Sequence, residues 1–181
     1  MGPTGTLMAN LEHLLVTGGC GFIGSNFVRH ILKNRPGTRI TVLDKMTYAA
    51  RRENLTDELE PIAGNLENLE IVHGDIGNLE LVRHLVASKR TGTPHIDTII
   101  NFAAETHVDR SILDPFVFSQ TNLIGTHTLL EAARERNLRY HQISTDEVYG
   151  HVAGTHHSLE TDGLQPRSPY SASKADRKSV V

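Results

Sequence analysis

The sequence predicts an α/β fold, a doubly wound parallel sheet with helices on both faces. Short apolar runs alternate with stretches of helical periodicity along most of the 181 residues, as they do in repeated strand–helix–strand units. Three regularly spaced glycines follow the first apolar run, and an acidic residue ends the second run, twenty positions after the last of these glycines. This order of strand, glycine turn, helix, strand and acid is typical of sheets that bind a nucleotide at their carboxyl edge.

The composition is that of an ordinary globular chain, with 38% hydrophobic and 22% charged residues. A net charge of −3 gives no reason to expect nucleic acid or a membrane surface as a partner. Cys20 is the only cysteine, so no internal disulfide is possible and a cytoplasmic location is favoured. The eleven histidines show no metal-ligand spacing, so we predict no metal site. Residues 1–10 are expected to be a disordered leader, and residues 11–175 one nucleotide-binding domain.

The first predicted strand covers residues 13–17 and stops at a glycine-rich turn. Gly18, Gly21 and Gly24 have the spacing G-x-x-G-x-x-G, and a helix is predicted over residues 25–34. Such glycines allow a tight turn, a close approach of the backbone to a pyrophosphate, and close packing of helix on strand. The start of the helix would add free N–H groups and the positive end of a dipole for the phosphates.

The second predicted strand covers residues 39–43 and leads into Asp44. At this distance from the glycine turn, a carboxylate is placed to accept hydrogen bonds from the adenosine ribose hydroxyls. An acid there also repels a 2′-phosphate, which favours NAD over NADP. The neighbouring cations Lys45, Arg51 and Arg52 leave NADP open as an alternative.

The third and fourth strands are predicted over residues 69–73 and 96–102, with a helix over residues 79–89 between them. Residues 45–68 read as a polar, partly helical excursion. After the third strand, Asp75 and Ile76 either bracket an adenine ring or form a plain turn. Small residues directly after the fourth strand would let a cofactor lie close to the backbone.

A long helix is predicted over residues 115–136, interrupted by the polar pair Thr121-Asn122, which either faces the site or is merely tolerated. The fifth strand, over residues 140–143, then delivers Thr145, Asp146 and Glu147 to the carboxyl edge of the sheet. Two adjacent acids there can supply one general acid and one general base. They are equally typical of a solvated turn or helix cap.

A loop over residues 151–169 precedes the last predicted helix, which contains Tyr170 and Lys174. Residues four apart share a face of a helix. An ammonium group beside a phenol favours the phenolate, which can take the proton from an alcohol while hydride leaves the same carbon. Thr145 would hydrogen-bond that alcohol. The alternative is a simple contact between a tyrosine and a lysine on a helix surface.

The segments Ala103-Ala104-Glu105-Thr106-His107-Val108-Asp109-Arg110-Ser111, Ser144-Thr145-Asp146-Glu147-Val148-Tyr149-Gly150 and Tyr170-Ser171-Ala172-Ser173-Lys174, with the glycine turn, resemble the extended short-chain dehydrogenase/reductase family. Within that family, the chain is similar to the dTDP-glucose 4,6-dehydratases over residues 14–175. The resemblance implies a Rossmann-type fold and a tightly bound NAD. It assigns to NAD the residues Gly18, Gly21, Phe22, Ile23, Gly24, Asp44, Lys45, Thr47, Asp75, Ile76, Phe102, Ala103, Ala104, Glu105, Thr121, Tyr170 and Lys174.

The resemblance also implies a reaction, the conversion of dTDP-glucose to dTDP-4-keto-6-deoxyglucose, for which synthesis of rhamnose is the commonest destination. Tyr170, helped by Lys174 and Thr145, would deprotonate the sugar C4 hydroxyl as hydride passes to NAD. Glu147 would remove the C5 proton, Asp146 would protonate the departing C6 hydroxyl, and the hydride would return to C6. Thr106 and Thr145 would contact the substrate. The alternatives are dehydration of a UDP-sugar and a non-catalytic NAD-binding protein.

The end of the chain departs from the family pattern. Family members continue into a smaller substrate domain, whereas residues 176–181 follow Ala175 without the apolar spacing of a buried helix. The codons GAT CGG AAG AGC GTC GTG of a common sequencing-library adapter encode these six residues, so we expect a non-native tail. We therefore expect the sheet to be truncated before the substrate domain and this chain to be inactive. Family members pair through the helices at 115–136 and 170–174, which implies a homodimer for the parent protein. Cys20 and Asn101 stand where Ala and His are frequent, with little effect expected.

Overall fold

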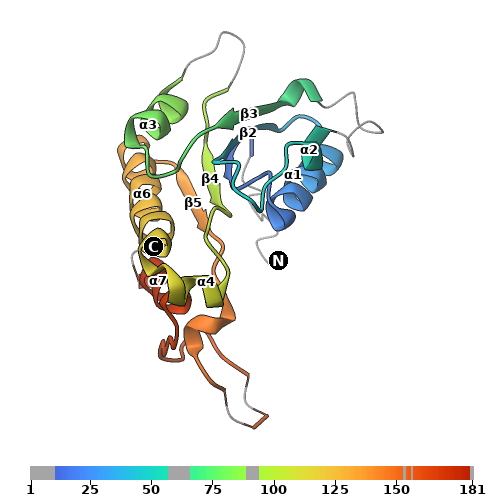
Figure 1. Ribbon diagram of the computed structural model, residues 1–181. Helices are drawn as coiled ribbons and strands as arrows, with labels where there is room; N and C mark the ends of the chain where they lie inside the picture. The colour runs from blue at the N-terminus through green and yellow to red at the C-terminus, as the bar shows by residue number, and fades with distance from the viewer. Residues whose placement is uncertain (1–10, 57–65, 89–93, 153, 156, 180–181) are drawn as a thin grey trace.

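The computed structural model describes residues 11–56, 66–88, 94–152, 154–155 and 157–179 (Figure 1). Five parallel strands form one sheet in the order β3-β2-β1-β4-β5. This order confirms the predicted doubly wound sheet of the Rossmann type. The chain adds β2 and β3 on one side of β1, and it then crosses back to add β4 and β5 on the other side. The predicted leader at residues 1–10 lies outside the described residues. The strands are β1 His13–Thr17, β2 Arg39–Asp44, β3 Leu69–His73, β4 Thr98–Asn101 and β5 Arg139–Gln142.

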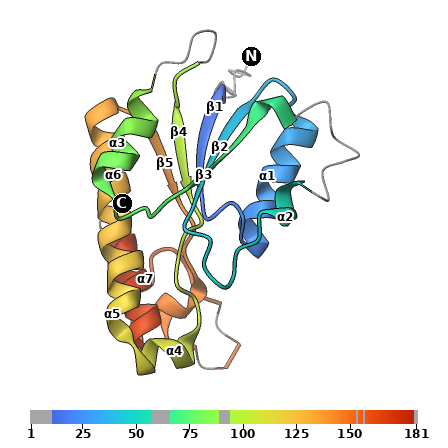
Figure 2. The ribbon, with the colours of Figure 1, turned by 45° about the horizontal axis from the view of Figure 1, so that its top comes forward.

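Helices cover both faces of the sheet (Figures 1 and 2). α1 Phe22–Asn34 and α2 Glu53–Thr56 lie on one face, while α3 Leu79–Ala87 and α6 Gly125–Arg136 lie on the other. Successive side chains of β1 alternate between the two cores. Leu14 packs in the cluster that contains Val28 of α1, and Leu15 packs in the cluster that contains Leu129 of α6. Burial on both faces explains why β1 reads as an apolar run without alternation.

The fourth strand is shorter than the predicted span of residues 96–102. Ile96 is buried in the core although it precedes the strand. Asp97, the next residue, also precedes the strand, and its carboxylate accepts hydrogen bonds from the backbone N–H groups of Glu12 and His13, at 2.8 and 2.9 Å. It also accepts a bond of 2.5 Å from the Arg139 guanidinium. These bonds tie the start of β4 to the starts of β1 and β5, where a sequence pattern shows only an acid beside an apolar run.

The long predicted helix over residues 115–136 is not a uniform α-helix. It consists of α5 Pro115–Phe118, the π-helical segment η2 Ser119–Ile124, and α6. A further helix, α4 Val108–Leu113, precedes it and was not predicted. Short π-helical segments often occur at functional sites because they turn a side chain out of the regular spacing.

The last helix, α7 Pro169–Ser179, packs against α4, α5 and η2. It begins one residue before the predicted Tyr170, and its backbone remains helical through residue 179. Between β5 and α7, the 3-10 helix η3 Asp146–Tyr149 carries the two predicted catalytic acids.

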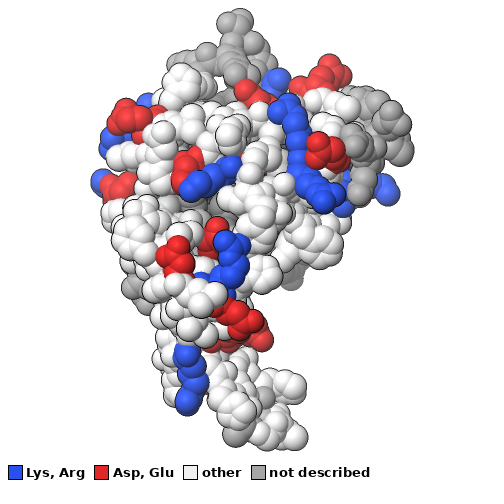
Figure 3. Space-filling view, in the orientation of Figure 1, with Lys and Arg blue, Asp and Glu red and all other residues white. Residues whose placement is uncertain are grey.

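The surface charges are mixed in sign. Acidic and basic side chains of the described residues are interspersed on the face shown in Figure 3. Within the described part of the chain, every helix is too short or too polar to cross a membrane.

Candidate functional site

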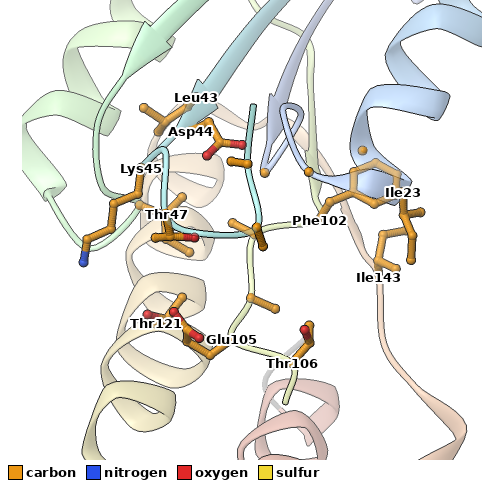
Figure 4. Close-up of a pocket in the computed structure, with 18 of the residues that line it drawn as sticks. Ile23, Leu43, Asp44, Lys45, Thr47, Phe102, Glu105, Thr106, Thr121 and Ile143 are labelled. Carbon is orange, nitrogen blue, oxygen red and sulfur yellow. The ribbon is translucent and has the colours of Figure 1, made fainter. Parts of the chain in front are cut away.

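A cavity of about 450 Å³ opens at the carboxyl edge of the sheet (Figure 4). Residues that follow or end all five strands line it, among them Gly18, Asp44, Asp75, Phe102 and Ile143. Every residue that the sequence resemblance assigned to NAD borders this cavity, and so does Thr106. The lining also includes residues that the sequence analysis missed, namely Leu43, Ala49, Ala50, Gly74, Ile143 and Ser144. Leu43, Gly74 and Ser144 each stand directly before a predicted site residue, which was the available signal, whereas Ala49, Ala50 and Ile143 adjoin no predicted site residue.

The turn after β1 is shaped by glycines that leave no room for a side chain. Gly18 has φ +68°, and a Cβ there would lie 2.6 Å from the backbone nitrogen of Ala103. A Cβ at Gly24 would overlap the carbonyl oxygen of Gly18. Helix α1 begins after Gly21, which has no side chain to cap the first N–H groups, and its first turn carries no acid. The turn is therefore suited to bind an anionic group at the helix N-terminus.

Asp44 is buried at the end of β2 and is held by two backbone donors. Its Oδ2 accepts the N–H of Cys20 and its Oδ1 accepts the N–H of Met46, both at 2.9 Å. A carboxylate oxygen can accept more than one hydrogen bond, so both oxygens retain capacity for a ligand in the cavity. Burial raises the pKa of the Cys20 thiol to about 12, and the charge of Asp44 contributes in the same direction. The thiol beside the turn is therefore neutral at neutral pH.

Asp75, after β3, is engaged by a cation. Its Oδ2 lies 2.7 Å from Nζ of Lys45, and its Oδ1 accepts the N–H of Gly77 at 2.8 Å. Burial raises the pKa of Asp75, but the bonds from Lys45 and Gly77 outweigh it and lower the pKa below its usual value. The carboxylate is therefore ionised, and its charge offsets that of Lys45 at the rim of the cavity.

Asn122, in the π-helical segment, joins two walls of the cavity. It is fully buried, and its Oδ1 accepts the N–H of Glu105 at 3.0 Å. Its Nδ2 donates to the carbonyl of Glu105 at 3.0 Å and to Oγ of Ser173 at 2.9 Å. The sequence left open whether this polar residue faced the site. The structure shows that it ties the segment after β4 to helix α7.

Tyr170 and Lys174 lie on one face of α7 and both line the cavity. They are 7% and 5% exposed, and Nζ of Lys174 lies 6.0 Å from the centre of the Tyr170 ring. Phe118 packs edge-on against the same ring, with centroids 6.4 Å apart. A buried phenol and ammonium beside a nucleotide-sized cavity are placed to exchange a proton with a ligand in it.

The two predicted acids lie beside the cavity rather than in its lining. Asp146 and Glu147 are exposed on η3, directly after Ser144, which does line the cavity. Thr145 donates to Oδ1 of Asp146 at 3.2 Å and accepts the N–H of Glu147 at 3.4 Å. Thr145 thus caps the 3-10 helix and fixes the direction in which the acids leave the strand. Among the described residues, no three His, Cys, Asp or Glu side chains gather as metal ligands do.

Comparison with known proteins agrees with this geometry. The sequence profile of the family described as GDP-mannose 4,6 dehydratase matches residues 15–181. A dTDP-glucose 4,6-dehydratase of Mycobacterium tuberculosis is 45% identical over 170 residues, which are 93% of this chain and 47% of the relative. The low-salt glycan biosynthesis protein Agl12 of Haloferax volcanii is 50% identical over 169 residues, 93% of this chain and 50% of the relative. The chain spans about half the length of the curated relatives that it matches.

Solved structures share the fold. The dTDP-glucose 4,6-dehydratase DesIV of Streptomyces venezuelae, solved with NAD and TYD bound, is 43% identical with a TM-score of 0.80. The alignment covers 93% of this chain and 50% of DesIV. A UDP-glucose 4-epimerase of Thermus thermophilus, solved with NAD, is 30% identical with a TM-score of 0.76, over 93% of this chain and 49% of the epimerase. These similarities confirm the resemblance inferred from the sequence. The chain therefore belongs to the family described as GDP-mannose 4,6 dehydratase, and it is similar to the N-terminal half of dTDP-glucose 4,6-dehydratases.

Proposed function

We propose that this chain supplies the NAD-binding half of an enzyme that converts dTDP-glucose to dTDP-4-keto-6-deoxyglucose with loss of water. The observation that carries the proposal is that buried Tyr170 and Lys174 line the same cavity as the glycine turn and Asp44. A proton-transfer pair and a dinucleotide site that share one cavity suit oxidation of an alcohol by a nicotinamide cofactor. The dTDP-glucose dehydratases among the relatives support the same reaction.

The residues of the cavity fit NAD in three respects. The glycine turn packs too closely for a Cβ at Gly18 or Gly24, and its bare backbone at Gly18, Gly21 and Gly24 borders the cavity where a pyrophosphate would lie. Asp44 is fixed by two backbone donors and keeps acceptor capacity for ribose hydroxyls. Lys45 is paired with Asp75, so its charge is already offset where a 2′-phosphate would need a cation. When bound, NAD would accept a hydride from the sugar and return it later in the reaction.

The residues of α7 and η3 would divide the proton transfers among them. Lys174 favours the phenolate form of Tyr170, and this phenolate takes the proton of the C4 hydroxyl and becomes a neutral phenol. Thr145 donates a hydrogen bond to the C4 oxygen. Glu147 removes the C5 proton, which the new C4 ketone makes acidic, and Asp146 gives a proton to the C6 hydroxyl that leaves as water. The exposure of both acids leaves them accessible to a sugar placed over the mouth of the cavity.

A second copy of the chain is the partner that we propose for α4, α5 and η2. Ile112, Leu113 and Phe116 are 65%, 84% and 68% exposed, and Ile124 is 50% exposed. Apolar side chains that gather on one exposed region indicate a protein interface. Sedimentation equilibrium should therefore show a dimer, and Phe116→Glu should shift it to monomer. A monomeric native protein would contradict this part of the proposal.

The experiment that tests the reaction uses the full-length protein and dTDP-glucose labelled with deuterium at C4. We expect a product that has lost one water and carries the deuterium at C6, as read by mass spectrometry and NMR. Tyr170→Phe and Glu147→Gln should each reduce turnover by about a hundredfold or more, the usual contribution of a general acid or base. Glu160→Gln, an exposed carboxylate outside the cavity lining, is the matched control and should keep full activity.

The same assay discriminates among substrates and against a purely binding role. UDP-glucose, UDP-N-acetylglucosamine and GDP-mannose are compared with dTDP-glucose at equal concentration, because the family profile and the relatives carry different sugar nucleotides in their names. Turnover of another nucleotide sugar in preference to dTDP-glucose would reassign the substrate. NAD binding with no turnover of any of the four would refute the dehydratase proposal.

A further inference from the structure

Three exposed side chains form a stack between two loops of the site. The guanidinium carbon of Arg110 lies 4.3 Å from the centre of the Tyr48 ring. The ring of His107 lies 5.8 Å from the same ring, centroid to centroid, at an interplanar angle of 38°. A cation within about 6 Å of an aromatic face is attracted to it, and tilted aromatic pairs at about 4.5–7 Å also attract. Tyr48 is therefore held by two partners.

The stack joins two walls of the cavity without lining it. Tyr48 lies after β2, between Thr47 and Ala49, and both of these neighbours line the cavity. His107 follows Thr106, which lines the cavity from the segment after β4. Figure 4 shows that Thr47 and Thr106 come from two separate loops. The three stacked side chains are themselves absent from the described lining residues.

We propose that Tyr48, His107 and Arg110 form a latch that controls how fast NAD enters and leaves the cavity. The identity of the cofactor rests on the proposed function, whereas the latch rests on the stack. A dinucleotide that spanned from Asp44 at the end of β2 to Phe102 after β4 would lie between the loop of Thr47 and the segment of Thr106, since both line the cavity. We expect these two loops to separate when it enters or leaves. The three residues are positioning residues, because they act through the loops that carry Thr47 and Thr106.

The latch has a kinetic signature that a residue in contact with NAD would lack. Because the stack lies outside the cavity, it stabilises the closed arrangement of the two loops equally whether the cavity is filled or empty. Breaking it lowers the barrier for entry and for release by the same amount. The on-rate and off-rate constants should therefore rise together while Kd stays within about twofold. A residue that binds NAD directly would change Kd, mostly through the off-rate.

The test measures NADH exchange on the full-length protein. NADH-loaded protein is mixed with excess NAD, and the fluorescence of released NADH is followed by stopped flow. Arg110→Ala should release NADH about two- to fivefold faster, the factor expected from an exposed cation–π contact. Tyr48→Leu removes both contacts of the ring and should accelerate release about five- to tenfold. Tyr48→Phe keeps the ring and should stay within about twofold of the native rate.

A double-mutant cycle separates the latch from a simple effect of charge. In the Tyr48→Leu background, Arg110→Ala should change the release rate by less than about 1.5-fold, because its aromatic partner is already gone. An equal acceleration in both backgrounds, or a Kd that rises in step with the off-rate, would overturn the latch. Failure of the native protein to bind NADH would overturn the cofactor assignment and the latch together. NADH binding without sugar dehydration would refute only the proposed reaction.

Discussion

Replacing Asn122 with leucine should destabilise the fold strongly, because this side chain satisfies buried polar groups on two elements. Leucine keeps a similar size but removes the acceptor for the N–H of Glu105 and the donor to its carbonyl. It also removes the donor to Ser173, although Oγ of Ser173 keeps its own 2.7 Å bond to the carbonyl of Tyr170. The perturbation therefore leaves one buried N–H without its acceptor and one buried carbonyl without its donor.

The magnitude follows from those two groups. A buried polar group left without its partner costs about 1–3 kcal/mol. The carbonyl is the more tolerant of the two, so we expect Asn122→Leu to lower the free energy of unfolding by about 2–4 kcal/mol. Ser173→Ala is the matched control: it removes one bond to Asn122 and the serine's own bond to the carbonyl of Tyr170, and it leaves both bonds to Glu105 in place. Its cost should be about 0.5–1.5 kcal/mol.

Urea titration monitored by circular dichroism measures both losses through the shift of the midpoint at constant slope. A loss below about 1 kcal/mol for Asn122→Leu would refute the reasoning, since it would mean that the freed groups of Glu105 find other partners. A loss for Ser173→Ala as large as that for Asn122→Leu would mean that the contact with α7 provides most of the stability of this junction. In that case the two bonds to Glu105 would contribute little.

Three further predictions concern the turn and the sheet. Gly18→Ala should lower the free energy of unfolding, measured by urea titration, by about 2 kcal/mol or more, because Gly18 has φ +68° and its Cβ would press on Ala103. Gly37→Ala is the control: its Cβ would meet no described atom within 4 Å, so the free energy of unfolding should change by less than about 0.5 kcal/mol. Cys20 should react slowly with iodoacetamide at about pH 8 in the native protein and quickly in urea, since burial raises its pKa to about 12; equal rates would contradict this. Burial lowers the pKa of His13, so below about pH 6.5 the folded chain binds fewer protons than the unfolded chain. The stability that this residue contributes is therefore present above about pH 6.5 and is lost as the pH falls. His13→Gln should show a smaller drop in urea midpoint than the native protein between about pH 7.5 and about pH 5, and equal drops would contradict the assignment.

The sequence predicted well those parts of the fold that depend on local spacing. The observed bounds of β1 and β3 are those predicted, because both are short apolar runs that stop at a glycine. The glycine turn and Asp44 were predicted as one site because strand, turn and helix fix their distance along the chain. Once the first strand–helix–strand unit is folded, its geometry brings the glycine turn and Asp44 together.

Contacts between residues far apart in the sequence could not be predicted from local sequence patterns. Asn122, in the π-helical segment, donates a hydrogen bond to Ser173, 51 residues later. Asn101 is a second example, because the sequence suggested only a neutral replacement for histidine. In the structure its amide nitrogen donates to Tyr140 and Gln142 of β5, and its oxygen accepts from Thr17 of β1. A hydrogen-bonded cluster across three strands is specified by positions that no local pattern connects.

The latch and the exposed acids place different demands on the two ligands of the proposed reaction. In the proposed reaction, hydride taken from C4 would return to C6, so NAD would end each cycle in its starting form and would not need to leave. A latch at Tyr48 and Arg110 that slows cofactor exchange is therefore compatible with rapid turnover. The sugar nucleotide would instead exchange in every cycle, and Asp146 and Glu147 are exposed beside the cavity. If the dehydration proceeds as proposed, breaking the latch should accelerate NADH exchange and leave kcat unchanged, whereas a dehydrogenase that released NADH in each cycle would turn over faster with the latch broken.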